Sequence, residues 1–148
     1  MALRLTRAGD YAVRAMIHIG SLPDGGVALK DEIALAEGIP PSFMAKILRQ
    51  LVRTGLLRSA RGVHGGFGLA RGAGDISLLD VVEAIEGPIQ LTDCSPDPER
   101  CTLSHDCPAS GVWLEVQQRM TGLLRETSLE ALLSAPRRNR RVMYRISG

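Results

Sequence analysis

The chain is poor in aromatic residues: two Tyr, two Phe and one Trp make up 3% of its 148 residues. A surface that stacks single-stranded bases or binds sugars needs aromatic rings, so neither kind of surface is favoured. The sequence has no apolar run of the roughly 18 to 20 residues that a membrane helix needs, and it does not start with a basic segment followed by a long apolar stretch. We therefore expect a cytoplasmic protein with no membrane partner.

Motifs of catalysis and of nucleotide binding are missing as well. The serines lie outside any GxSxG nucleophile turn, and no GxxxxGK phosphate loop followed by Ser or Thr occurs. The glycines of HGGFG, at 64–68, fit a hairpin and not the strand-to-helix turn of a nucleotide site. We expect neither an enzyme nor a small-molecule substrate.

Length and charge indicate one domain with two electrostatically different halves. The 148 residues are 45% apolar, which is enough for one buried core. Residues 1–71 carry ten Lys and Arg against five Asp and Glu, and residues 72–136 carry three against eleven; residues 137–148 add five Arg and no acid. This division indicates that one region binds a polyanion. Chance clustering of charges on solvated faces is the alternative.

The first half has the pattern of three helices followed by a β-hairpin, which together make a winged helix-turn-helix. Gly38 ends the second helix and Pro41 begins the third, because glycine closes helices and proline suits their first position. The third helix has an apolar stripe at i, i+3, i+4, i+7 and i+8: Met44, Ile47, Leu48, Leu51 and Val52. The predicted ranges are 7–20 with Thr6 as N-cap, 29–38 and 41–55 for the helices, and 56–71 for the hairpin with its tip at 62–66.

The second half is predicted to hold three more helices and one long loop. Capping boxes at Ser77 with Asp80, and at Thr127 with Glu130, predict the start of two short helices. The predicted helix ranges are 78–87, about 109–126 and 128–135, and the loop spans 88–108. We expect a single winged-helix domain over 1–136, with its DNA-binding part over about 1–72, and a basic, disordered tail at 137–148.

The polar face of the third helix and the hairpin suit double-stranded DNA. Basic side chains can bind phosphates or guanine edges in a major groove, and a glycine-rich wing can approach a backbone or minor groove closely. The candidates are Ser42, Lys46, Arg49, Gln50 and Arg53 on the helix and Arg58, Arg61 and His64 on the hairpin. A solvated basic face is the alternative, because any surface helix has a polar side.

Three cysteines, Cys94, Cys101 and Cys107, are separated by six and five residues in the predicted loop. These gaps are wider than the two to four residues that are typical of structural zinc pairs. They suit an iron-sulfur cluster whose fourth ligand comes from elsewhere. Two other interpretations stay open: reduced cysteines without a ligand, or zinc bound by the cysteines and His105.

Four segments together resemble the Rrf-type winged-helix repressors typified by IscR, NsrR and RirA. They are LRLTRAGDYAVRAM at 3–16, the stretch from LAEGIPP to GGFGLAR at 35–71, ISLLDVVEAIEG at 76–87, and the cysteine loop before a long helix. The likeness runs from about residue 3 to 134. It implies a mainly helical homodimer with a β-hairpin wing, in which the helix over 109–126 crosses its partner copy. It also implies an iron-sulfur cluster, held by the cysteine loop near that interface.

Position by position, the resemblance makes Cys94, Cys101 and Cys107 cluster ligands, Ser42 to Arg53 the recognition helix and Arg61 the wing arginine. In the IscR branch the fourth ligand is a histidine three residues after the last cysteine. Here that position is Ser110, so this assignment of the fourth ligand fails. Asp10 matches the aspartate with which the nitric-oxide-sensing branch completes a 4Fe-4S site from the other subunit, so that a 4Fe-4S cluster is favoured over 2Fe-2S. Asp10 as a plain helix stabiliser is the alternative, because Arg14 lies at i+4.

Two departures from the family pattern concern the signal and the operator. The first cysteine gap is six rather than five, so neither the cluster type nor the sensed signal is carried over from the family. Ala45 replaces a recognition-helix glutamate, so the operator sequence is not carried over either. We expect a DNA-binding regulator, a repressor, that senses iron-sulfur status, nitric oxide, iron or redox state. The alternative is a cluster-free or zinc-binding thiol switch that is controlled by oxidation or by a protein partner.

Overall fold

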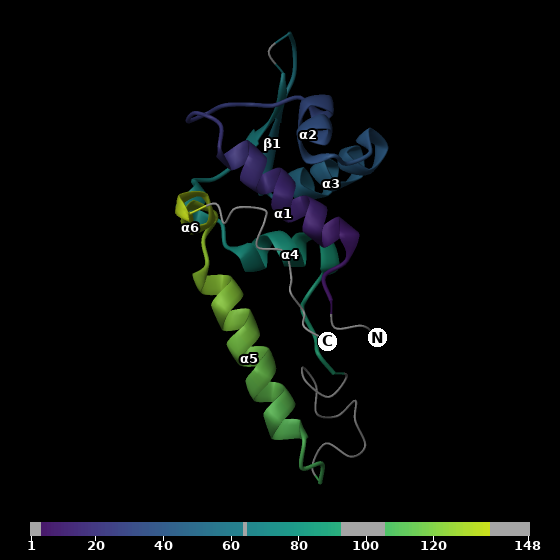
Figure 1. Ribbon diagram of the computed structural model, residues 1–148, viewed down its shortest axis with the longest axis vertical. Helices are drawn as coiled ribbons and strands as arrows, with labels where there is room; N and C mark the ends of the chain where they lie inside the picture. Colours follow the sequence, from purple (N-terminus) through teal and green to yellow (C-terminus); the bar gives the residue numbers. More distant parts are fainter. Residues whose placement is uncertain (1–3, 64, 93–105, 137–148) are drawn as a thin grey trace.

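The computed structural model of the chain describes residues 4–63, 65–92 and 106–136. Its helices are α1 (Arg7–Gly20), α2 (Lys30–Glu37), α3 (Pro41–Arg53), α4 (Leu78–Glu86), α5 (Ser110–Glu126) and α6 (Leu129–Ser134), with a 3-10 turn η1 (Ala73–Asp75). The strands are β1 (Leu57–Ala60) and β2 (Gly66–Leu69). Figure 1 shows a body made of α1 to α4, α6 and the hairpin, from which α5 extends as a long arm. None of the helices in the described part is long and apolar enough to span a membrane.

Helix α1 forms where its cap and its apolar spacing predict it. The Thr6 hydroxyl accepts a hydrogen bond from the Gly9 N–H at 3.2 Å, which satisfies one of the free donors of the first turn. The side chains of Ala12, Ala15 and Met16 are fully buried on one face. The predicted range of 7–20 is therefore confirmed, and α1 provides the central surface against which the other helices pack.

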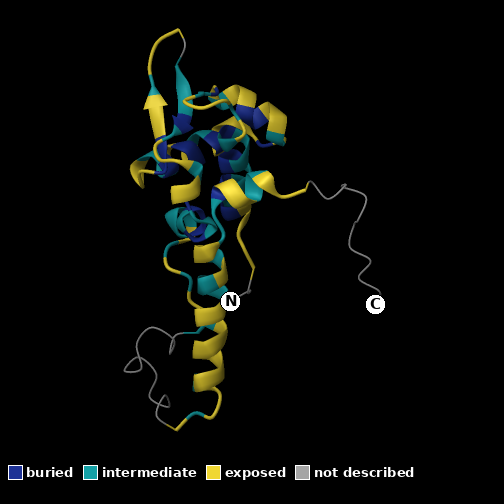
Figure 2. Cartoon of the chain, turned by 90° about the vertical axis from the view of Figure 1, so that its left-hand side faces the viewer, coloured by how far each residue is buried: buried dark blue, intermediate teal, exposed yellow. Residues whose placement is uncertain are grey.

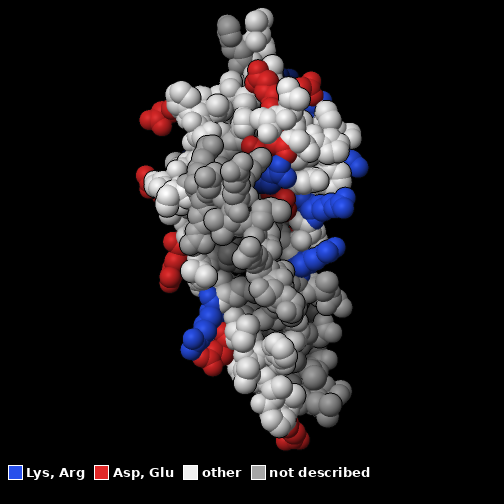
Figure 3. All heavy atoms as spheres, viewed as in Figure 1, with Lys and Arg blue, Asp and Glu red and all other residues white. Residues whose placement is uncertain are grey.

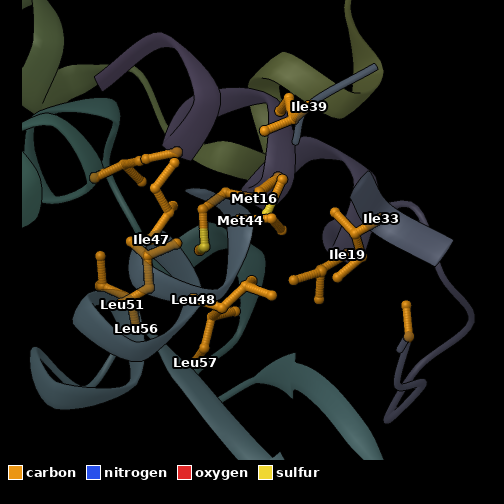
Figure 4. Packing of buried hydrophobic residues seen from close by; sticks show 14 of the residues in the cluster. Met16, Ile19, Ile33, Ile39, Met44, Ile47, Leu48, Leu51, Leu56 and Leu57 are labelled. Carbon is orange, nitrogen blue, oxygen red and sulfur yellow. The ribbon is translucent and has the colours of Figure 1, made fainter. Parts of the chain in front are cut away.

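Helices α2 and α3 form the helix-turn-helix. Gly38 ends α2 with φ 65°, a left-handed conformation that glycine adopts without strain, and Pro41 opens α3. The apolar stripe of α3 faces the core: Met44, Ile47, Leu48 and Leu51 are buried, and Val52 is half-buried. In Figure 4 the four buried side chains of this stripe converge with Met16 of α1 and with Leu56 and Leu57, which follow α3. The packed stripe leaves the opposite side of α3 toward solvent.

The hairpin wing is fastened to the turn before α2. Strands β1 and β2 pair antiparallel, with Leu57 opposite Leu69 and Ala60 opposite Gly66. Ala28 adds a third chain, because its N–H donates to Phe67 O at 3.0 Å and its carbonyl accepts from Phe67 N at 2.8 Å. Gly66 has φ 146°, and a Cβ there would lie 2.6 Å from Ala28 O, so only glycine fits.

Helices α4 and α6 meet at a short bridge that corrects one prediction. The capping box of α4 is present, with Asp80 N–H on the Ser77 hydroxyl at 3.0 Å and Ser77 N–H on the Asp80 carboxylate at 2.9 Å. For α6 the predicted N-cap Thr127 is wrong: Ser128 caps it and accepts from Ala131 N at 3.0 Å. The reason is tertiary: Ser128 forms a β-bridge with Ser77, in which the Leu78 N–H donates to Thr127 O at 2.8 Å, and the bridge holds Ser128 extended at the start of α6.

Candidate DNA-binding surface and cysteine segment

One side of α3 carries a stripe of exposed polar and basic side chains: Ser42, Lys46, Arg49 and Arg53. Their spacing of i, i+4, i+7 and i+11 places them within about 60° of one another around the helix and over about 16 Å of its length. The whole of α3 contains no Asp or Glu. We call these four residues the α3 stripe. In Figure 3, the Lys and Arg side chains of the upper body gather on the side where Figure 1 places α3.

Gln50 does not lie with the α3 stripe, and the structure corrects the predicted placement of this residue. Its side-chain Nε2 donates a hydrogen bond to the carbonyl oxygen of Ala84 in α4 at 3.2 Å, and the contact is partly buried. The side chain therefore connects two helices of the protein instead of facing solvent beside Arg49. The sequence pattern missed this because Gln50 lies on the flank of the polar face, and its partner is 34 positions away.

The structure treats the three predicted wing residues differently: one is exposed, one is hydrogen-bonded within the protein, and one lies outside the described residues. Arg61 is exposed and precedes Gly62, which has φ 103°. Arg58 is exposed too, but its Nη2 donates to Gly25 O at 2.8 Å and so fastens the wing to the turn before α2. His64 lies outside the described residues. Of the predicted wing contacts, Arg61 has its side chain in the open at the tip, where Val63 is also 96% exposed.

Of the three predicted cysteine ligands, the structure describes Cys107. It is half-buried and lies just before α5, where its carbonyl accepts hydrogen bonds from Ser110 N at 3.1 Å and from the Ser110 hydroxyl at 2.9 Å. Cys94 and Cys101 lie outside the described residues, and so does His105. The grouping of the three thiols therefore stays a prediction from the sequence.

Asp10 lies in the first turn of α1 and pairs with Arg14, four residues on, at 3.7 Å. Its side chain is 56% exposed. Arg14 also reaches α2: its Nε lies 3.3 Å from the Glu37 carboxylate, and its Nη2 donates to the Glu37 carbonyl. His18 Nδ1 lies 3.4 Å from the other Glu37 oxygen. This link between α1 and α2 was not predicted, because its members are far apart in sequence and share no motif.

Helix α5 has no buried residue in its 17 positions, and Figure 2 shows most of its length as exposed. Val112, Val116 and Leu123 are exposed large apolar side chains, at 60%, 42% and 66%. Their spacing of i, i+4 and i+11 places them on one side of a helix about 25 Å long. A row of exposed apolar side chains along one side of a helix is typical of a protein interface.

Comparison with known proteins gives consistent matches. The profile of the Rrf2 family, described as "Iron-dependent Transcriptional regulator", matches residues 5–135. A Mycobacterium tuberculosis protein named as an HTH-type transcriptional regulator is 37% identical over 134 residues, which are 86% of this chain and 79% of that protein. The HTH-type transcriptional regulator IscR of Xenorhabdus nematophila is 32% identical over 131 residues, which are 88% of this chain and 79% of that protein.

Solved structures show the same architecture. CymR of B. subtilis, described as the global cysteine regulator, has a TM-score of 0.76 at 25% identity, and the match covers 90% of this chain and 98% of that chain. IscR of T. potens has a TM-score of 0.72 at 25% identity, with 90% and 88% covered. These matches confirm the mainly helical winged-helix fold. The matching proteins are transcriptional regulators, which confirms the expectation that the chain is not an enzyme.

Proposed function

We propose that this chain, which belongs to the Rrf2 family of transcriptional regulators, represses transcription by binding a DNA operator through α3 and the wing. The observation that carries the proposal is the α3 stripe. A B-DNA major groove admits one α-helix, and Lys and Arg are suited to phosphates and guanine edges there. Since α3 carries no carboxylate, nothing on the helix repels the backbone. Ser42, Lys46, Arg49 and Arg53 are the proposed contacts.

The wing supplies a second contact. Arg61 is exposed at the hairpin tip, while Arg58 and Ala28 fix the base of the hairpin to the turn before α2. These bonds hold the base of the hairpin against the turn that precedes the helix-turn-helix. We propose that Arg61, together with His64, contacts the backbone or minor groove beside the site that α3 occupies, where arginine is favoured.

A homodimer follows from α5. An apolar row along a helix without a buried residue needs a cover, and a second copy offers the same row in reverse, as a two-fold interface requires. The dimer would present two α3 stripes to the two halves of a palindromic operator. We propose α5 as the dimerisation helix.

For the sensor, we propose that Cys94, Cys101 and Cys107 hold an iron-sulfur cluster, with Asp10 of the partner copy as fourth ligand. Three thiolates are the donors that such clusters use, and the matched family is described as iron-dependent. A cluster supplies a group that nitric oxide or oxidants destroy, so its loss can report iron, nitric oxide or redox state. A 4Fe-4S cluster is favoured over 2Fe-2S.

A thiol switch without a cluster is the second candidate, and one observation supports it. CymR of B. subtilis, a structural neighbour at 25% identity, is described as the global cysteine regulator, and CymR of Staphylococcus aureus, which shares the fold at 22% identity, was solved in an oxidized form. Oxidation of Cys94, Cys101 or Cys107, or zinc binding by them, would then change DNA binding directly or through a protein partner.

Two measurements test these proposals separately. Selection of duplexes from a random library by the full chain, followed by fluorescence anisotropy, should yield a palindromic sequence bound far more tightly than unrelated DNA. Failure to enrich any sequence would contradict the operator proposal.

Absorbance with iron and sulfide analysis of protein purified without oxygen tests the sensor: a brown protein supports the cluster, and a colourless protein with zinc or no metal supports the thiol switch.

A further inference from the structure

The last turn of α4 is bonded to two other helices. A helix end leaves its final carbonyls without partners inside the helix, and here the Ala84 carbonyl receives the Gln50 amide of α3 at 3.2 Å. On the same turn, the Glu86 carboxylate accepts from the Thr6 N–H at 3.0 Å and from the Thr6 hydroxyl, at the start of α1. The end of α4 is thus fixed to α3 through its backbone and to α1 through a side chain.

The same turn is where the chain leaves for the cysteines. Gly87 ends α4 with φ 76°, and its N–H donates to Glu83 O at 2.9 Å. The Leu91 N–H then donates to the Gln117 side-chain oxygen of α5 at 3.0 Å. Three residues later comes Cys94, the first proposed ligand. A displacement of the chain beyond Thr92 would therefore be passed along the backbone through Gly87 to the end of α4, and through the Leu91 bond to α5.

Gln50 is the side chain through which α3 meets this turn. It lies one residue after Arg49 of the α3 stripe, between the exposed stripe and the buried Leu48 and Leu51. Apolar contacts resist separation of helices but are not directional, whereas a hydrogen bond fixes direction. The apolar stripe sets which side of α3 faces solvent, and the bond from Gln50 to Ala84 adds a directional link that limits small rotations of α3 and so affects the direction in which Arg49 points.

We infer that Gln50 is a positioning residue: it ties the recognition helix to the last turn of α4, so that the state of the cysteine segment alters how the α3 stripe meets DNA. The inference rests on the proposed function. It gives Gln50 a role inside the protein in place of the DNA contact for which the sequence made this residue a candidate. Coupling between two sites is reciprocal, so DNA held by α3 must also stabilise the end of α4.

This reciprocity gives a test that needs no knowledge of the signal. Hydrogen exchange of the full chain is measured with and without a saturating operator duplex, and the readout is exchange of the amides at 87–91. In the wild type, DNA should slow their exchange several-fold. Gln50→Met keeps length and helix propensity but removes the amide, so this protection should disappear and operator affinity should fall about 2- to 10-fold, which is one neutral hydrogen bond. Affinity for unrelated DNA should stay unchanged.

Two controls separate positioning from plain stability. Gln118→Met makes the same change on an exposed position of α5 and should leave both readouts as in the wild type. Gln50→Arg restores a donor and should restore protection at 87–91, with Gln118→Arg as the control for added charge. Operator binding by the wild type without protection at 87–91, or protection that persists in Gln50→Met, would overturn the inference and leave the proposed function standing. A wild type that binds no operator would remove both.

Discussion

Replacing Arg49 by alanine should weaken operator binding without unfolding the protein. The side chain is exposed in the middle of the α3 stripe, so its removal creates no cavity, and alanine favours a helix at least as well as arginine. The proposed dimer carries two copies of the residue, and each variant dimer loses two contacts. We expect a loss of about 1 to 3 kcal/mol for each contact, and so about 2 to 6 kcal/mol for operator binding by the dimer.

The salt dependence distinguishes the two kinds of contact that Arg49 can make. Each phosphate contact contributes about 0.9 to the slope of log K against log salt, so loss of two phosphate contacts should lower the slope by about 2. Affinity would then fall equally for every DNA sequence. A guanine contact would instead leave the slope nearly unchanged and relax specificity at one base pair in each half-site.

Fluorescence anisotropy between about 50 and 300 mM salt measures both affinity and slope. Arg125→Ala is the matched control, because Arg125 is an exposed arginine in the last turn of α5, outside the α3 stripe and the wing. It should leave specific binding unchanged. Wild-type affinity and slope in Arg49→Ala, with the control also unchanged, would show that the α3 stripe is a solvated face that does not meet DNA.

Four further outcomes are expected. Leu123→Glu puts a charge in the apolar row of α5 and should shift sedimentation from dimer to monomer, whereas a stable dimer would reject that interface. Ser128→Ala removes the cap of α6 and should lower unfolding free energy by about 1 kcal/mol, against no change for the exposed Ser134→Ala, as denaturant titration can show. Gly66→Ala should lower stability by about 1 to 3 kcal/mol, because a Cβ meets Ala28 O, and an unchanged melting temperature would contradict this. Alanine at all three cysteines should abolish the response to air or nitric oxide but keep DNA binding; a response that persists excludes them as the sensor.

Local signals in the sequence were sufficient for much of the fold. The N-cap at Thr6, the break at Gly38 and Pro41, and the box of Ser77 with Asp80 each satisfy backbone groups within a few residues, so they act wherever the segment lies. The buried side of α3 was equally predictable, because an apolar stripe at helical spacing needs a core to cover it. The same stripe fixed which residues of α3 stay outside.

Two predictions were wrong because the residues concerned have partners that are far away in the sequence. Thr127 has the spacing of a capping box, yet Ser128, which the β-bridge to Ser77 holds extended, is the N-cap of α6. The helical periodicity places Gln50 on the polar side of α3, yet its side chain donates a hydrogen bond to the carbonyl of Ala84, which has no partner within α4. In both cases a backbone group of α4 or its N-cap decides the outcome, and only the packed chain brings that group near.

The two roles considered for Asp10, helix stabiliser and proposed cluster ligand, do not exclude each other. Arg14 has two acidic partners, Asp10 at 3.7 Å and the less exposed Glu37 at 3.3 Å. An exposed pair at i, i+4 contributes only about 0.3 to 0.5 kcal/mol, so Asp10 can turn away from Arg14 at little loss. Arg14 would then keep its contacts to Glu37 and continue to join α1 to α2. The role of helix stabiliser is therefore compatible with the proposed role of Asp10 as a ligand of a cluster on the partner copy, because the helix-turn-helix would remain in place in both.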